Sequence, residues 1–273
     1  MDLPSWSVHW TIPAGIGLVL ALYALAIGPL RRRHGWGPPV PREQIACFAT
    51  GHLVLFLVLT GPIHDLSDSY LFTVHMLQHL IITLLVPPLL LVGTPDWLVR
   101  RMLSPRPLDR LARAFGQAPA AYLIFSLTLA VWHMPVLYNS TLLQLEVHVT
   151  EHLLFIGSAL IGWWPILAPA REYRGSMVVQ MIYLLLIPFP MKIVGIMITL
   201  SGTVLYPAYA IAPRIWGITP LLDQQIGGMI MWVPAGFVFW IALAAHFFRW
   251  WEEARAQERG DTKIVPLARE RVT

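Results

Sequence analysis

The sequence predicts an all-α, polytopic membrane protein with seven transmembrane helices, its N-terminus outside and its C-terminus inside. Three observations favour this class: the composition, the number of long apolar stretches and the placement of basic residues. Hydrophobic residues make up 56% of the 273 residues and charged residues only 12%. The mean hydropathy of +0.62 lies outside the range of soluble globular proteins.

Seven apolar stretches are each long enough to cross a membrane, because a spanning helix needs about 20 mostly apolar residues. We expect one membrane domain over residues 1–250, followed by a cytoplasmic tail over residues 251–273. The single cysteine, Cys47, excludes an internal disulfide and a four-cysteine metal site. The predicted spans are Ile12–Leu30, Gln44–Pro62, Phe72–Val92, Ala118–Val136, Val147–Leu167, Met177–Leu200 and Gly227–Phe248.

Basic residues set the predicted orientation. The first, third and fifth connections and the C-terminal tail hold 17 of the 19 lysines and arginines. The other two are Arg214, in the sixth connection, and Lys192, inside the sixth span. Because basic loops are retained on the cytoplasmic side, the chain is predicted to begin outside and end inside. Contact with anionic lipid explains these arginines, so they indicate no nucleic-acid partner.

Five histidines are predicted to collect in one layer near the outer surface, and a sixth, His64, is a candidate for the lid of that layer. The third and fifth spans both enter from outside, and each carries two histidines four residues apart near its outer end, which places each pair on one helix face. The fourth span runs the other way and ends with a histidine at the same depth, while one more lies in the outer connection before the third span. These residues are His64, His75, His79, His133, His148 and His152.

A shared metal ion is the interpretation that we favour for this layer. A lone histidine in a membrane helix is usually a hydrogen-bonded packing residue, but several neutral imidazoles in apolar surroundings need partners, and one metal satisfies many nitrogens. Met76 and Met134 directly follow His75 and His133. Imidazole with nearby thioether suits copper, especially Cu(I), and also permits zinc or haem iron. Since each methionine lies about 100° around the helix from its histidine, both could instead be ordinary core or lipid-facing residues.

Two charged residues inside the predicted spans are expected to support the histidine layer. Glu151 precedes His152, and Lys192 lies in the sixth span at a comparable depth, just after the double proline of Pro188 and Pro190, which should kink that helix. An ion pair between Glu151 and Lys192 is the simplest expectation, since each charge alone is costly in lipid. Glu151 could alternatively orient a ligating imidazole. His52, near mid-membrane, is open between packing, a relay and haem ligation.

Three stretches resemble the multi-spanning CtaG family of cytochrome c oxidase assembly factors. The first runs from His75-Met76-Leu77-Gln78-His79-Leu80 through Pro87-Pro88-Leu89-Leu90 to Gly93-Thr94-Pro95. The second is Trp132-His133-Met134-Pro135 with Tyr138, and the third is Glu151-His152-Leu153-Leu154-Phe155 leading to Trp163-Trp164-Pro165. The resemblance implies a multi-pass plasma-membrane protein that is needed to form active haem-copper oxidase and takes part in copper delivery.

The first functional hypothesis is therefore a non-enzymatic assembly factor whose outer histidines take copper from an extracytoplasmic donor and pass it to an oxidase subunit. A haem-binding membrane redox protein is the second hypothesis. A copper or proton transporter, using Lys192, Glu151 and His52 as a path, ranks lower because the inner half offers few polar residues. The sequence leaves the oligomeric state open, a homo-oligomer included.

Overall fold

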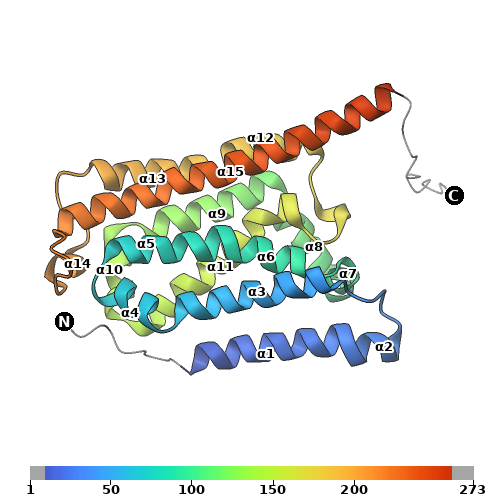
Figure 1. Cartoon of the computed structure of the whole chain (residues 1–273), viewed down its shortest axis with the longest axis horizontal. Helices are drawn as coiled ribbons and strands as arrows, with labels where there is room; N and C mark the ends of the chain where they lie inside the picture. Colours follow the sequence, from blue (N-terminus) through green and yellow to red (C-terminus); the bar gives the residue numbers. More distant parts are fainter. Residues whose placement is uncertain (1–9, 260–273) are drawn as a thin grey trace.

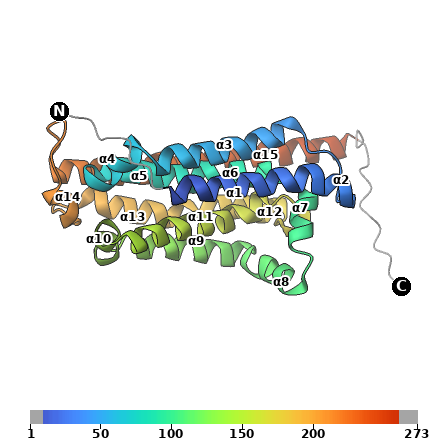
Figure 2. The same ribbon diagram turned by 90° about the horizontal axis from the view of Figure 1, so that it is seen from below.

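The computed structural model describes residues 10–259, and every regular element within them is helical. The long helices lie side by side as a bundle, with α1 at one edge and α15 at the opposite edge (Figures 1 and 2). The helices are α1 Thr11–Leu25, α2 Arg31–His34, α3 Arg42–Leu59, α4 Pro62–Ser69, α5 Phe72–Leu80, α6 Val86–Gly93, α7 Asp96–Met102, α8 Arg106–Phe115, α9 Ala118–Trp132, α10 Pro135–Leu143, α11 Leu145–Leu167, α12 Met177–Leu186, α13 Pro188–Leu200, α14 Pro207–Ile211 and α15 Pro220–Glu258.

Five segments of this bundle are long and apolar enough to cross a membrane, and the prediction of an all-helical membrane protein is confirmed to this extent. They are Thr11–His34, Arg42–Leu59, Phe72–Gly93, Met177–Leu200 and Pro220–Ala256, and the bent pair α8 and α9 would make a sixth. The number of seven crossings and the placement of the termini stay predictions. Of the predicted tail, residues up to Glu258 continue α15, and residues 260–273 lie outside the described part.

The fifth predicted span is present as α11, a helix of 23 residues. It is long enough to cross a membrane, yet it is absent from the five apolar segments. His148, Glu151 and His152 all lie in its first two turns and lower its hydropathy. The same polar residues that interrupt the apolar pattern are therefore the ones that the sequence singles out, the two histidines as candidate ligands and Glu151 as a supporting charge.

A proline break divides the third span and is stabilised by a tryptophan. Between α5 and α6 the helix widens into a π-type turn over Ile81–Leu85, just before Pro87. Pro87 has no N–H and cannot bond to the carbonyl of Thr83, four residues earlier. Trp163 of α11 donates to that carbonyl from Nε1 at 3.0 Å. The carbonyl of Thr83 therefore has a partner despite the break. The same hydrogen bond joins α5 and α6 to α11.

The sixth span is broken at the double proline, as the sequence predicts. Helix α12 ends at Leu186 and α13 begins at Pro188. Helix α13 then packs closely on α15 through glycines, because a Cβ added at Gly195 would lie 3.0 Å from the carbonyl oxygen of Gly228. Such close contact between backbones is typical of helix pairs in membranes.

One end of the bundle, which we call the histidine end, is closed by the short helices α4, α10 and α14 (Figure 1). There the start of α5 is fixed by a residue of α15. The fully buried carboxylate of Asp223 accepts from the backbone N–H groups of Phe72 at 2.8 Å and Thr73 at 2.9 Å. These N–H groups have no partner within α5, so Asp223 acts as its N-terminal cap from another helix. The cap sets the position of α5 and of the histidines one turn further on.

Candidate metal centre

Four segments bring the six predicted histidines together at the histidine end. Helix α4 supplies one, α5 supplies two, the residue after α9 is another, and α11 supplies two. Neighbouring rings in the cluster have centroids 4.2 to 6.4 Å apart. All six side chains are buried. The structure thus brings the five histidines predicted for one layer together with His64, and each ring is near at least one other.

The first ligand set joins α5 to α11. Nε2 of His75 lies 2.8 Å from Nε2 of His79, and the latter lies 3.8 Å from Oε1 of Glu151. One donor atom from each of the three residues lies within 4.8 Å of the others. Two ligand atoms that bind the same tetrahedral ion, each at about 2.1 Å from it, lie about 3.4 Å from one another. The observed spacings bracket this value, so a single ion fits with small side-chain adjustments.

Two further sets extend the cluster toward the end of the bundle. Asp68 of α4 lies 3.5 Å from Nε2 of His64 and 3.4 Å from Nδ1 of His148. On α11 itself, His148, Glu151 and His152 form a set with the same close spacing of donor atoms. Because His148 and Glu151 each belong to two sets, the three sets form one connected site with alternative ligand combinations.

Asp68 lies in the connection between two spans, and its carboxyl group is affected by burial. Burial raises the pKa of Asp68 to about 7, the hydrogen bond from Ser67 lowers it, and the nearby charge of Asp65 raises it. A buried carboxyl beside two imidazoles gains an opposite charge when either ring is protonated or when a cation binds between them. Asp68 is thus a candidate oxygen ligand beside His64 and His148.

Several donor atoms in the cluster have no hydrogen-bond partner among the described residues. They include Nε2 of His133, Nε2 of His152 and both oxygens of Glu151, whose side chain is 0% exposed. The hydroxyl of Thr141 is near Glu151 but donates to the carbonyl of Tyr138 at 2.7 Å instead. Buried polar atoms are almost always paired in folded proteins. A bound cation would give unpaired buried oxygens and imidazole nitrogens of this kind a partner.

A small thioether-lined hollow adjoins the cluster. Met76 lies there beside His79 and His133, together with Met191 of α13 and Met231 of α15. The Nδ1 atom of His133 lies 2.7 Å from the carbonyl oxygen of Leu129, so the proton of the neutral ring is on Nδ1 and the lone pair is on Nε2. The free volume is about 10 Å³, which is room for about one water-sized particle.

Two predicted site residues lie elsewhere. Met134 is 56% exposed at the start of α10 and does not join the cluster, because the helix turns sharply after His133 and carries the next residue outward. Lys192 does not form the expected ion pair with Glu151. Its Nζ lies 4.5 Å from the centre of the Trp240 ring of α15, because α13 packs along α15 and the lysine stem lies against Gly236 of that helix.

Three contributors to the site were not predicted. Asp68 follows His64 by four residues, the same spacing as the two histidine pairs, so the sequence did carry a signal for it. Tyr209 of α14 lies 3.2 Å from Nδ1 of His75 through its hydroxyl, which donates to the carbonyl of Ser67. Met191 completes the hollow with Met76. Neither Tyr209 nor Met191 has a sequence pattern that distinguishes it from a packing residue.

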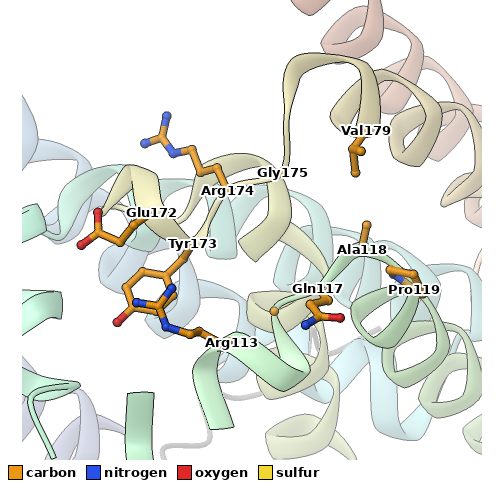
Figure 3. A pocket seen from close by; sticks show the side chains of 10 residues that line it. Arg113, Gln117, Ala118, Pro119, Glu172, Tyr173, Arg174, Gly175 and Val179 are labelled. Atoms are coloured by element: carbon orange, nitrogen blue, oxygen red, sulfur yellow. The ribbon is translucent and has the colours of Figure 1, made fainter. Parts of the chain in front are cut away.

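The opposite end of the bundle has a different character. A hollow of about 410 Å³ lies where α8 meets α9, and Figure 3 shows its lining side chains, including Arg113, Glu172, Tyr173 and Arg174. Arg113 pairs with Asp109 at 3.0 Å. Its described lining contains no histidine, and exposed pairs of this kind contribute little to stability or affinity. The metal-binding chemistry of the described residues is concentrated at the histidine end.

Fold and site together define a polytopic helical membrane protein with a buried histidine and carboxylate cluster at one end of its bundle. The chain matches the family of cytochrome c oxidase caa3 assembly factors over residues 21–253, and it belongs to that family. The predicted resemblance is thereby confirmed.

The other comparisons add less. An uncharacterized protein of Mycobacterium leprae (strain TN) is 24% identical over 271 residues, which cover 88% of this chain and 38% of the relative. The chain therefore spans well under half the length of that curated relative. No solved structure matches the chain.

Proposed function

We propose that this protein is a non-enzymatic assembly factor that binds copper in its histidine cluster and delivers it to a copper centre of cytochrome c oxidase. The family supplies the connection to oxidase assembly. The observation that carries the copper step is the convergence of six buried histidines with two carboxylates, several of whose donor atoms lack partners. In this proposal copper is cargo, received from an extracytoplasmic donor and passed to an oxidase subunit.

The donor atoms fit copper in both of its common oxidation states. The sets around Glu151 and Asp68 offer imidazole nitrogen and carboxylate oxygen, which suit Cu(II) and also zinc. The hollow beside His79 and His133 adds the thioethers of methionines, which suit Cu(I). A site with both kinds of donor can exchange ligands as an ion moves through it. The volume of the hollow favours an ion over haem, because a porphyrin needs far more than the space of one water molecule.

The proposal includes the seven crossings and the orientation expected from the arginines, with the histidine end facing the outside of the plasma membrane. Copper from an extracytoplasmic donor would then reach the cluster without crossing the bilayer. Asp68 and His64 of the short helix α4 lie on the side from which such an ion would enter, and His133 with the methionine hollow lies deeper. This arrangement favours an acceptor and donor of copper over a transporter.

The test is metal analysis of the purified full chain loaded with Cu(I) under reducing conditions and washed. We expect the variant His75→Ala/His79→Ala to lose most of its bound copper, because both residues belong to the set that joins α5 to α11. The matched control is His34→Ala/His246→Ala, which removes two histidines far from the cluster and should keep the copper content of the wild type. Equal copper in the cluster variant and the wild type would refute the ligand assignment, and preferential loading with zinc would refute the choice of metal.

A further inference from the structure

Lys192 is a cationic side chain inside a membrane span, and the histidine cluster does not use it. It lies in Met177–Leu200, one of the five segments apolar enough to cross a membrane. Its Cα is eight residues, or about 12 Å, from Leu200 and fifteen residues, or about 22 Å, from Met177. Side chains on a helix point toward its N-terminus, so the ammonium group is turned toward the middle of the span. It is therefore too deep to reach either surface.

The surroundings of this ammonium group are aromatic. Nζ lies 4.5 Å from the centre of the Trp240 ring and 5.8 Å from that of Phe189. Among the described residues, no carboxylate forms an ion pair with it. A cation held over a ring gains some electrostatic energy, but much less than the cost of placing it in hydrocarbon. The chain thus provides a position for the charge without neutralising it.

The position is built into the contact between α13 and α15. A Cβ added at Gly236 would lie 3.1 Å from Cε of Lys192, so the absence of a side chain at Gly236 lets the lysine stem lie against α15. The stem crosses this gap to bring Nζ over Trp240. A lysine that merely faced lipid would not require a glycine on the neighbouring helix. Its placement is therefore specific.

The charge lies on the outer surface of the bundle. Phe189 and Trp240 are 48% and 53% exposed, so the rings that flank Nζ face away from the core. Further apolar side chains continue this face along both helices, and we call it the Lys192 face. It comprises Phe189, Lys192, Ile193, Ile196, Phe237, Trp240 and Ile241.

We propose that the Lys192 face docks a transmembrane helix of the oxidase subunit that receives copper, and that this helix carries an Asp or Glu at mid-membrane depth. The identity of the partner as an oxidase subunit rests on the proposed function. The chemistry rests on charge complementarity, since a carboxylate placed against Nζ would neutralise the one cation that the chain leaves unpaired in this span. Phe189 and Trp240 would shield the pair from lipid.

The test uses the full chain reconstituted in phosphatidylcholine bilayers without metal and labelled with a fluorescent donor on Cys47. The probes are two synthetic leucine-rich transmembrane helices that differ at one central residue, Glu or Gln, and carry an acceptor dye. We expect the Glu helix to bind about tenfold more tightly than the Gln helix, a difference of about 1.4 kcal/mol. This preference should disappear in Lys192→Met and persist in Lys192→Arg.

Leu123→Met, a lipid-facing change on α9 that is 55% exposed and outside the Lys192 face, is the matched control and should keep the preference for the Glu helix. Equal binding of the two helices by the wild type, or a preference that survives in Lys192→Met, would overturn the proposal. Loss of the preference when phosphatidylglycerol is added would assign the site to a lipid headgroup and would overturn it too. Because no copper is present, the outcome is independent of the copper content that tests the histidine cluster.

Discussion

The cap that Asp223 provides to α5 should control both stability and the position of the histidine cluster. Its two carboxylate oxygens each accept one backbone N–H, at 2.8 and 2.9 Å, and the group is fully buried. Asp223→Ala leaves both N–H groups unpaired, and each unpaired buried donor costs about 1–3 kcal/mol. We therefore expect a loss of about 4 kcal/mol in the free energy of unfolding. In Asp223→Asn only one oxygen can accept, so the loss should be about 2 kcal/mol.

The assay is reversible unfolding of the purified protein in mixed micelles of dodecyl maltoside and dodecyl sulfate. Leu222→Ala, one residue away and 47% exposed, is the control and should change the free energy by less than about 0.5 kcal/mol. The order of effects, Ala greater than Asn greater than the control, follows from the count of unpaired donors. If both Asp223 variants unfold within about 0.5 kcal/mol of the wild type, the reasoning about the cap is refuted.

Two further predictions concern how the helices are held together. Trp163→Phe removes the donor to the carbonyl of Thr83 and should lower the free energy of unfolding by about 1–3 kcal/mol, measured in the same micelles. A variant as stable as the wild type would mean that this carbonyl finds another partner. Gly195→Val places a branched side chain against the backbone at Gly228, where a Cβ alone would lie 3.0 Å from the carbonyl oxygen. It should separate α13 from α15 and lower the thermal transition, and an unchanged transition would show that the two helices can move apart freely.

The sequence was sufficient to predict the histidine cluster because its main signal is periodic. His75 with His79, and His148 with His152, are each four residues apart, and this spacing places both members of a pair on one helix face whatever the rest of the fold. His133 could be added because it lies near the outer end of a predicted span, and His64 because it lies in the outer connection beside the third span. Clusters of side chains on regular helices near their ends are thus accessible to reasoning from spacing and depth alone.

The position of Lys192 was not predictable in the same way. The estimated depth in the membrane placed Lys192 level with Glu151. Depth does not determine toward which neighbouring helix a side chain points. The packing of α13 on Gly236 of α15 accommodates this side chain. That packing is a contact between segments far apart in the chain.

The turn after His133 explains the corresponding error for Met134. Helix α9 ends at Trp132, and α10 begins at Pro135 in a new direction. The proline predicts a helix boundary, but the sequence does not fix which way the chain leaves it. The thioether of Met134 therefore indicated less about its location than did its position at a helix boundary, where the direction of the chain changes.

The cluster draws its ligands from α4, α5, α11 and the end of α9, and this has a thermodynamic consequence. An ion bound between His79 and Glu151 ties α5 to α11, so part of its binding energy becomes folding energy of the bundle. Under the proposed function, linkage makes the empty protein less stable than the metal-loaded one, and the helices that close the histidine end then open more readily. Release of copper, as proposed, would weaken the same contacts that close the histidine end, so that unloading and opening would favour each other.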